Sequence, residues 1–218
     1  MKNNFLRRIL AALLALLLCS FAVLPVFGVN DADEPADAAE STESTESAAS
    51  DAPEAAAEDV ISIATADDLI ALAANCTLDS WSLGKTVVLE ADLDLSDAAF
   101  RPIATFGGTL DGQGHAIRGL SVTDAMSPVG LIGTLQATGV VRDLTVEGTV
   151  TPGGDSVSTG GIVGENDGLI ENCAFHGAVS GVWASGGIAG ENKAAGTVRA
   201  CRVSGTVDGE NRTGGVVG

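Results

Sequence analysis

The sequence predicts an all-β protein folded as a right-handed parallel β-helix (β-solenoid), with coils of about 28 residues and an N-terminal capping helix. The first observation is the phrase Gly-Gly-Ile-Val-Gly-Glu-Asn at 160–166, which returns in similar form at 186–192 and opens again at 214–218. A divergent copy stands at 130–133, so equivalent glycines lie 31, 26 and 28 residues apart, a period typical of stacked repeats. The second observation is that apolar and polar residues alternate over short runs broken by glycines, which favours strands and turns.

Each repeat has room for three short strands joined by glycine turns, at roughly 3.3 Å per residue, which return the chain to its starting corner. The next repeat then stacks on the first, with strands about 4.8 Å apart and inward side chains aligned in ladders. Two such ladders are predicted, one of Leu144, Cys173 and Cys201 and one of Val146, Phe175 and Val203.

The repeated glycines Gly161, Gly164, Gly187 and Gly190 are interpreted as structural rather than ligand-cradling. They mark places where the backbone takes a positive φ or where neighbouring coils approach closely. Aromatic residues make up only 4% of the chain and tyrosine is absent, so the interior must be narrow. A wide ligand-bearing barrel is not expected.

The first 59 residues are predicted to form no part of the solenoid. Residues 1–28 have the cationic start, apolar core and small residues near the end that are typical of a secretory signal peptide, with an uncleaved anchor as the alternative. Lipidation at Cys19 is not expected, because Leu18 is too bulky for the preceding position. Residues 29–59 hold eleven acidic residues and no Lys or Arg, which indicates a disordered acidic Ala/Ser/Thr/Glu linker.

Charge and cysteine content narrow the function classes. The formal net charge is −18, and it becomes more negative without the cations of the signal, which argues against nucleic acid and anionic membranes as partners. No membrane insertion is expected after signal removal. Cys173 and Cys201 share one position in successive coils, so a disulfide is one option, but free packed thiols are favoured because Leu144 occupies the same position. Cys76 has no evident partner, and the spacing matches no zinc site.

Residues 60–125 are assigned to the capping helix and the first strands. Over 65–75, Thr65 and Asp68 form a capping box, and Leu69 and Leu72 lie on an apolar face. Because the end of a solenoid exposes strand edges and core, this helix is expected to cover it.

Within 86–120 the phrases Asp-Leu-Asp-Leu-Ser, Pro-Ile and Gly-Thr-Leu-Asp-Gly precede the Gly-Leu-Ile-Gly and Gly-Gly-Ile-Val-Gly-Glu-Asn repeats. In this order they closely resemble the GLUG-motif repeat proteins of bacterial cell surfaces, over residues 60–218. The resemblance implies a secreted or surface-displayed bacterial protein, and similar repeats flank catalytic domains in immunoglobulin A-cleaving metallopeptidases. It supplies no catalytic residues. Residues 126–218 are therefore assigned to GLUG-type repeats, truncated at the C-terminus and expected to continue into further repeats or domains.

The groups that could serve a carbohydrate-cleaving β-helix are Asp92, Asp94, Asp111, Asp143, His115, His176 and Arg142. Asp92 and Asp94 alternate with leucines as in an ordinary half-buried strand, and Asp111 fits a turn that bonds its own backbone. Asp92, Asp94 and Asp97 could bind calcium, but a structural capping role is the favoured interpretation. Trp81 or Trp183 could stack on a sugar, but a tryptophan that covers the edge of the core is the favoured interpretation.

The sequence therefore predicts no catalytic, cofactor-binding or metal-binding residue. It indicates a secreted or surface-displayed stalk or adhesion module that is not an enzyme, with an unknown extracellular protein or glycan as its ligand. The alternatives are a polysaccharide lyase or hydrolase and the accessory repeats of a larger surface peptidase.

Overall fold

A computed structural model of the protein describes residues 59–123, 126–155 and 157–218. The predicted signal peptide, and all of the predicted linker except Asp59, lie outside the described residues. The described residues belong to one compact unit.

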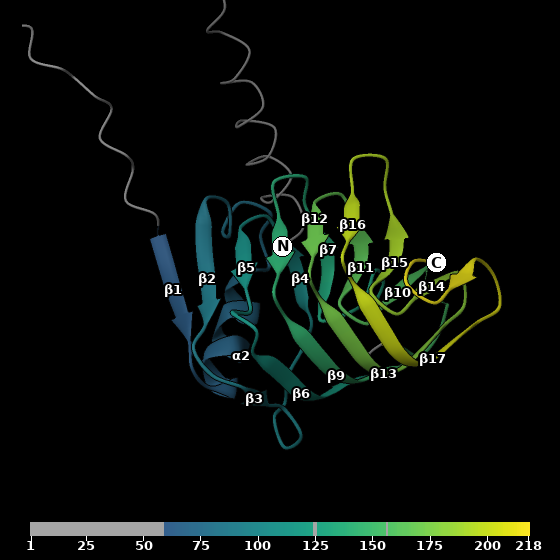
Figure 1. Cartoon of the computed structure of the whole chain (residues 1–218), viewed down its shortest axis with the longest axis horizontal. Helices are drawn as coiled ribbons and strands as arrows, with labels where there is room; N and C mark the ends of the chain where they lie inside the picture. The colour runs from purple at the N-terminus through teal and green to yellow at the C-terminus, as the bar shows by residue number, and fades with distance from the viewer. Residues whose placement is uncertain (1–58, 124–125, 156) are drawn as a thin grey trace, which may run out of the picture. The chain divides into compact units, whose positions relative to one another are not determined.

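The unit is a β-solenoid of about five turns, with about 28 residues per turn and parallel strands throughout (Figure 1). Its one described helix is α2 (Ala66–Asn75). The strands are β1 (Asp59–Ile63), β2 (Lys85–Leu89), β3 (Leu93–Asp94), β4 (Ile103–Phe106), β5 (Thr109–Asp111), β6 (Ala116–Val122), β7 (Ile132–Leu135), β8 (Val140–Arg142), β9 (Thr145–Val150), β10 (Ser158–Gly160), β11 (Val163–Asn166), β12 (Leu169–Glu171), β13 (Ala174–Gly181), β14 (Ala184–Gly186), β15 (Ala189–Asn192), β16 (Thr197–Arg199), β17 (Arg202–Gly209) and β18 (Thr213–Gly214).

Four sheets run along the stack: sheet A (β1-β2-β5-β8-β12-β16), sheet B (β3-β6-β9-β13-β17), sheet C (β4-β7-β11-β15) and sheet D (β10-β14-β18). Each early coil contributes strands to sheets A, B and C, which agrees with the three strands predicted per repeat. The later coils add a strand in sheet D, because Ser158–Gly160 and Ala184–Gly186 pair with each other in parallel register. The expectation of three strands per repeat is therefore wrong for the coils that carry the full Gly-Gly phrase.

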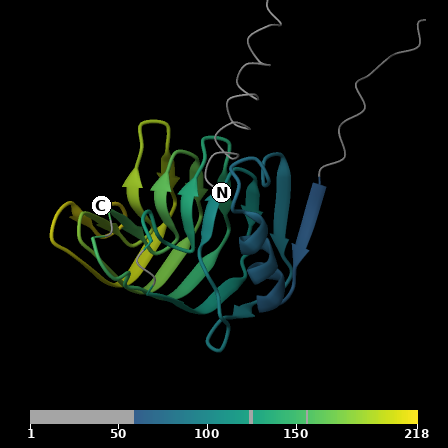
Figure 2. The same ribbon diagram turned by 180° about the vertical axis from the view of Figure 1, so that it is seen from behind.

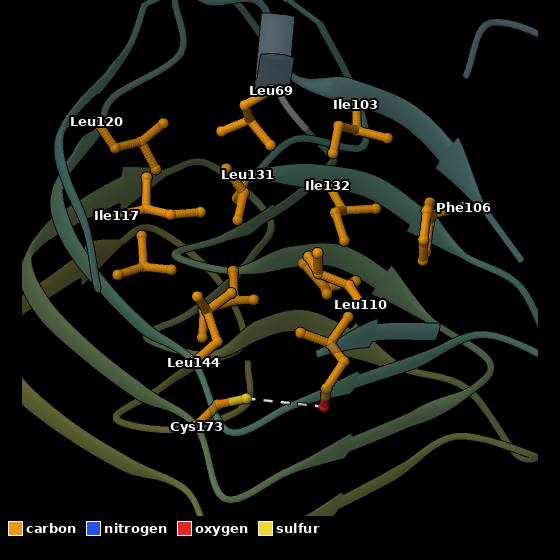
Figure 3. Close-up of a cluster of buried hydrophobic side chains, with 14 of the residues drawn as sticks. Leu69, Ile103, Phe106, Leu110, Ile117, Leu120, Leu131, Ile132, Leu144 and Cys173 are labelled. Carbon is orange, nitrogen blue, oxygen red and sulfur yellow. Dashed lines mark hydrogen bonds between the residues drawn. The ribbon is translucent and has the colours of Figure 1, made fainter. Parts of the chain in front are cut away.

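The capping helix is confirmed. The Thr65 hydroxyl accepts from the Asp68 backbone N–H at 3.2 Å, and the Asp68 carboxylate accepts from the Thr65 backbone N–H at 2.9 Å. Leu69 and Leu72 are buried in the core that runs through the coils, and Figure 3 shows Leu69 above Leu131 and beside Ile103. Seen from behind, the helix lies beside the first strands (Figure 2).

Both predicted ladders are confirmed. Phe175 pairs with Val146 on one side and with Val203 on the other. Leu144, Cys173 and Cys201 each stand immediately before a residue that is paired in the same register, so the three are aligned as well. Figure 3 shows Leu144 and Cys173 one above the other. Leu144 and Cys173 are buried, whereas Cys201 and Val203 of the last described coil are partly buried and pack on the core.

The repeated glycines are explained by close approach of backbones and not by positive φ. None of Gly161, Gly164, Gly187 and Gly190 has a positive φ. A Cβ on Gly164 would lie 2.4 Å from the Val129 nitrogen, and one on Gly190 would lie 2.4 Å from the Thr159 nitrogen. Sheets C and D thus press their backbones together, which only glycine permits.

Positive φ occurs instead at the corner between sheets A and B. Asp143, Asn172 and Ala200 occupy equivalent positions in three coils, with φ of 52°, 51° and 52°. The Asn172 side-chain amide donates to the Asp143 carboxylate. Asn and Asp tolerate this left-handed conformation, whereas alanine is strained in it by roughly 1–2 kcal/mol.

We therefore expect Ala200→Asn to raise the free energy of unfolding of the last described coil by about 1 kcal/mol. The same exchange at Ala195, an exposed turn residue without positive φ, is the control and should change little. Chemical denaturation and hydrogen exchange of residues 196–209 should be measured for both variants. Equal effects at the two positions would show that backbone strain at Ala200 is not the cause.

Candidate functional site

The corner between sheets A and B brings together two of the polar residues singled out in the sequence, Asp143 and His176. A shallow corner groove of about 350 Å³ follows it across four coils. We define the corner groove by its lining residues: Gly114, Asp143, Leu144, Thr145, Asn172, Cys173, Ala174, His176 and Arg202.

Within the corner groove the structure brings together two of the candidate catalytic residues, Asp143 and His176. The Asp143 carboxylate accepts from Asn172, and the His176 ring contacts the Ser204 hydroxyl through Nδ1. The groove holds a single carboxylate, whereas most glycoside hydrolases use a pair flanking the scissile bond.

A second cluster forms around Asp92 on the outer side of sheet B. Its Oδ1 accepts from the Ala116 backbone N–H at 3.0 Å and lies 3.2 Å from Nδ1 of His115. Its Oδ2 accepts from Arg118 at 2.8 Å, and Arg118 also lies 3.5 Å from Glu147. The Ala116 N–H and the Arg118 and His115 side chains lower the pKa of Asp92 from 3.8 to about 2. Asp92 is thus a fixed anion that ties two coils together.

We expect Asp92→Asn to lower the melting temperature at pH 7. The folded pKa of Asp92 lies below its unfolded value, so the stabilisation is fully present above pH about 4 and disappears as the pH falls toward 2. The difference in melting temperature between the variant and the parent should therefore shrink over that window. Asp97→Asn, at an exposed acid, is the control. A difference that stays constant down to pH 2 would contradict the assigned role of the charge.

A row of alternating charges runs along sheet A beside the corner groove. Asp111, Arg142, Glu171 and Arg199 are successive partners in the register. Arg142 donates to Asp111 from Nη2 at 2.8 Å, and Arg199 donates to Glu171 from Nε at 2.8 Å. Asp111 also accepts from the Gln113 backbone N–H at 2.9 Å, which confirms the predicted turn aspartate. Facing opposite charges stabilise neighbouring strands, so this row has a structural explanation.

The remaining candidates lie apart from the corner groove. Asp94 accepts from the backbone N–H and the hydroxyl of Ser96 at 2.9 and 2.7 Å, as in a local turn. Asp97 is exposed, and over the described ranges no group of three or more His, Cys, Asp and Glu residues could hold a metal ion. Trp81 is half-buried under Lys85, whose Nζ lies 5.5 Å from the ring centroid, and Trp183 is 49% exposed.

Sequence reasoning missed the pairing of Arg118 with Asp92 and the alternating row of sheet A. The sequence contained a signal for the row, because its successive members are separated by 31, 29 and 28 residues, which is close to the repeat period. An alignment of the coils by their glycines would place them in one column. The partners of Arg118 lack such a signal, since β6 contains a register shift between Ile117 and Leu120.

The comparisons with known proteins add one partial likeness. Halomucin of Haloquadratum walsbyi (strain DSM 16790 / HBSQ001) is 35% identical over 98 residues. Those residues are 44% of this chain and 1% of halomucin, so the chain spans only a small part of that protein. No protein-family model matches the chain, and no solved structure matches it. Among the described residues, no helix is long and apolar enough to span a membrane.

Proposed function

We propose that the chain is a secreted or surface-displayed repeat module of the GLUG type, which serves as a stalk or adhesion scaffold and performs no chemistry of its own. The observation that carries this proposal is the stacking of similar coils through parallel strands. Each added coil lengthens such a stack by about 4.8 Å without altering the coils before it. A fold of this kind suits the holding of binding surfaces at a distance.

The outer surface of the coils supports the same function. Its charged side chains neutralise one another across coils, as in the Asp92–Arg118–Glu147 cluster and the alternating row of sheet A. The corner groove between them is open and shallow, and His176 and Arg202 are among its lining residues. A groove of this shape fits an extended glycan or peptide of an extracellular partner. The partial likeness to a protein named as a mucin agrees with a place outside the cell.

Export and surface display can be tested in a bacterial host with the full chain carrying a C-terminal epitope tag. We expect the tag to be labelled by antibody on intact cells or to be found in the medium, and a variant lacking residues 1–28 to stay inside. Retention of the full chain in the cytoplasm would overturn the proposed location.

The purified chain should next be tested on glycan and extracellular-protein arrays and on uronic acid polymers. Binding that weakens on Arg202→Ala, without shortening of any polymer, is the expected result. Cleavage of a polymer that is lost on His176→Ala would instead show a carbohydrate-active enzyme.

A further inference from the structure

Cys173 and Cys201 face each other across adjacent coils with both flanks held in register. Glu171 pairs with Arg199 on one side, and Ala174 pairs with Arg202 on the other. The Arg202 backbone N–H also donates to the Cys173 carbonyl at 3.0 Å. The two Cα atoms are therefore separated by about one strand spacing, about 4.8 Å, which lies inside the range of 4.4–6.8 Å that disulfides span.

The two side chains also have the same orientation. Each Sγ lies 3.2 Å from the carbonyl oxygen two residues earlier, Glu171 for Cys173 and Arg199 for Cys201. Each also contacts a carbonyl of the preceding coil, at 3.7 Å for Cys173 and 3.8 Å for Cys201. Parallel side chains at this spacing can be joined by rotation about the Cα–Cβ bonds and a small approach of the strands.

The two thiols differ in access. Cys173 is buried with 1% exposure, whereas Cys201 is partly buried and can be reached from solvent. The interaction between the two thiols lowers the pKa of Cys201 to about 7, and the same interaction together with burial raises the pKa of Cys173. Cys201 is thus the sulfur that meets an oxidant first.

We propose that Cys173 and Cys201 are an oxidation site at which a disulfide ties the last described coil to the coil before it. The proposal goes beyond the scaffold function and does not depend on it, although an exported protein meets the oxidising surroundings in which such bonds persist. The closed loop of about 28 residues would fasten β16 and β17, the strands at the edges of sheets A and B.

A small-molecule disulfide such as glutathione disulfide is the oxidant class, and it reacts in two exchanges. The Cys201 thiolate attacks one oxidant sulfur, the oxidant S–S bond breaks, and one small thiolate leaves. Cys173 then loses its proton and attacks Cys201 Sγ in the mixed disulfide, which releases the second small thiolate. Two protein thiols are oxidised to one disulfide, the oxidant is reduced to two thiols, and the two protons pass to those thiols.

The test uses the folded full chain incubated with glutathione disulfide, then alkylated, denatured and digested with trypsin. Cleavage places Cys173 in peptide 143–193, Cys201 in peptide 200–202, and both Cys19 and Cys76 in peptide 9–85. We expect peptide 143–193 linked to peptide 200–202, separable by reductant and absent from Cys201→Ser and Cys173→Ala. Hydrogen exchange of residues 196–209 should slow by on the order of tenfold or more on oxidation and recover on reduction.

Three outcomes would overturn the proposal. Peptide 200–202 could carry glutathione only, with Cys173 alkylated after prolonged incubation. The link could form only in urea that unfolds the chain, or it could join peptide 9–85 instead. Cys201→Ser keeps the fold testable if Cys173→Ala fails to fold, because Cys201 is only partly buried.

Discussion

Gly161→Ala is expected to cause a large loss of stability. An added Cβ would lie 2.3 Å from the Gly187 carbonyl oxygen and 2.5 Å from Cδ2 of Phe175. The oxygen belongs to the backbone of the next coil, so it cannot rotate away, and the two coils must separate. We expect the free energy of unfolding to fall by roughly 3 kcal/mol or more.

Gly215→Ala is the matched control for this substitution. Gly215 occupies the same place in the repeat, but a Cβ there meets no atom within 4 Å among the described residues. Neither glycine has a positive φ, so the conformational effect of alanine is the same at both. The control should be neutral or slightly stabilising. Urea denaturation with hydrogen exchange of each coil measures the two variants, and equal losses would refute close approach as the reason for the glycine.

Phe175→Ala should have an effect of similar size. Phe175 is fully buried, is paired in register with Val146 and Val203, and packs on the Gly161 corner. Removal of the ring leaves a cavity that the hydrogen-bonded coils on both sides cannot close. The expected loss in the free energy of unfolding is about 3–5 kcal/mol. Denaturant titration of the purified chain measures it, with hydrogen exchange of β9, β13 and β17 to locate the loosened coils.

Val203→Ala gives the comparison at the same ladder position. Val203 is only partly buried, and its side chain is smaller than that of Phe175. A loss well below that of Phe175→Ala is expected, because less apolar surface is removed and one side already meets solvent. If the two substitutions cost the same, the core between the coils would be less tightly packed than the structure indicates.

Repetition made the fold predictable from sequence. Because the chain repeats at about 28 residues, the partners of Phe175 could be predicted as Val146 and Val203, although they are distant along the chain. The capping helix was predictable for a different reason. Thr65 and Asp68 act within one turn of helix, so their interaction depends on local geometry alone.

The candidate site was predicted less completely. The sequence supplied Asp92, His115 and His176 as isolated candidates and left their neighbours unknown. The structure places Asp92 with His115 and Arg118, and places His176 in the corner groove with Asp143. The coils at the start of the solenoid differ in length from the later ones, so a single repeat period does not give the cross-coil partners there.

The sequence by itself determined the parallel solenoid, its period, its two inward ladders and its cap. These features follow from residue spacing and from hydrogen bonds within a few residues. Only the tertiary structure decided that the Gly-Gly phrase builds the extra sheet D and that its glycines allow sheets C and D to touch. It also decided which charged side chains form ion pairs near the corner between sheets A and B. Close approach and ion pairing depend on distances between backbones that are separate along the chain, and these distances exist only once the coils have stacked.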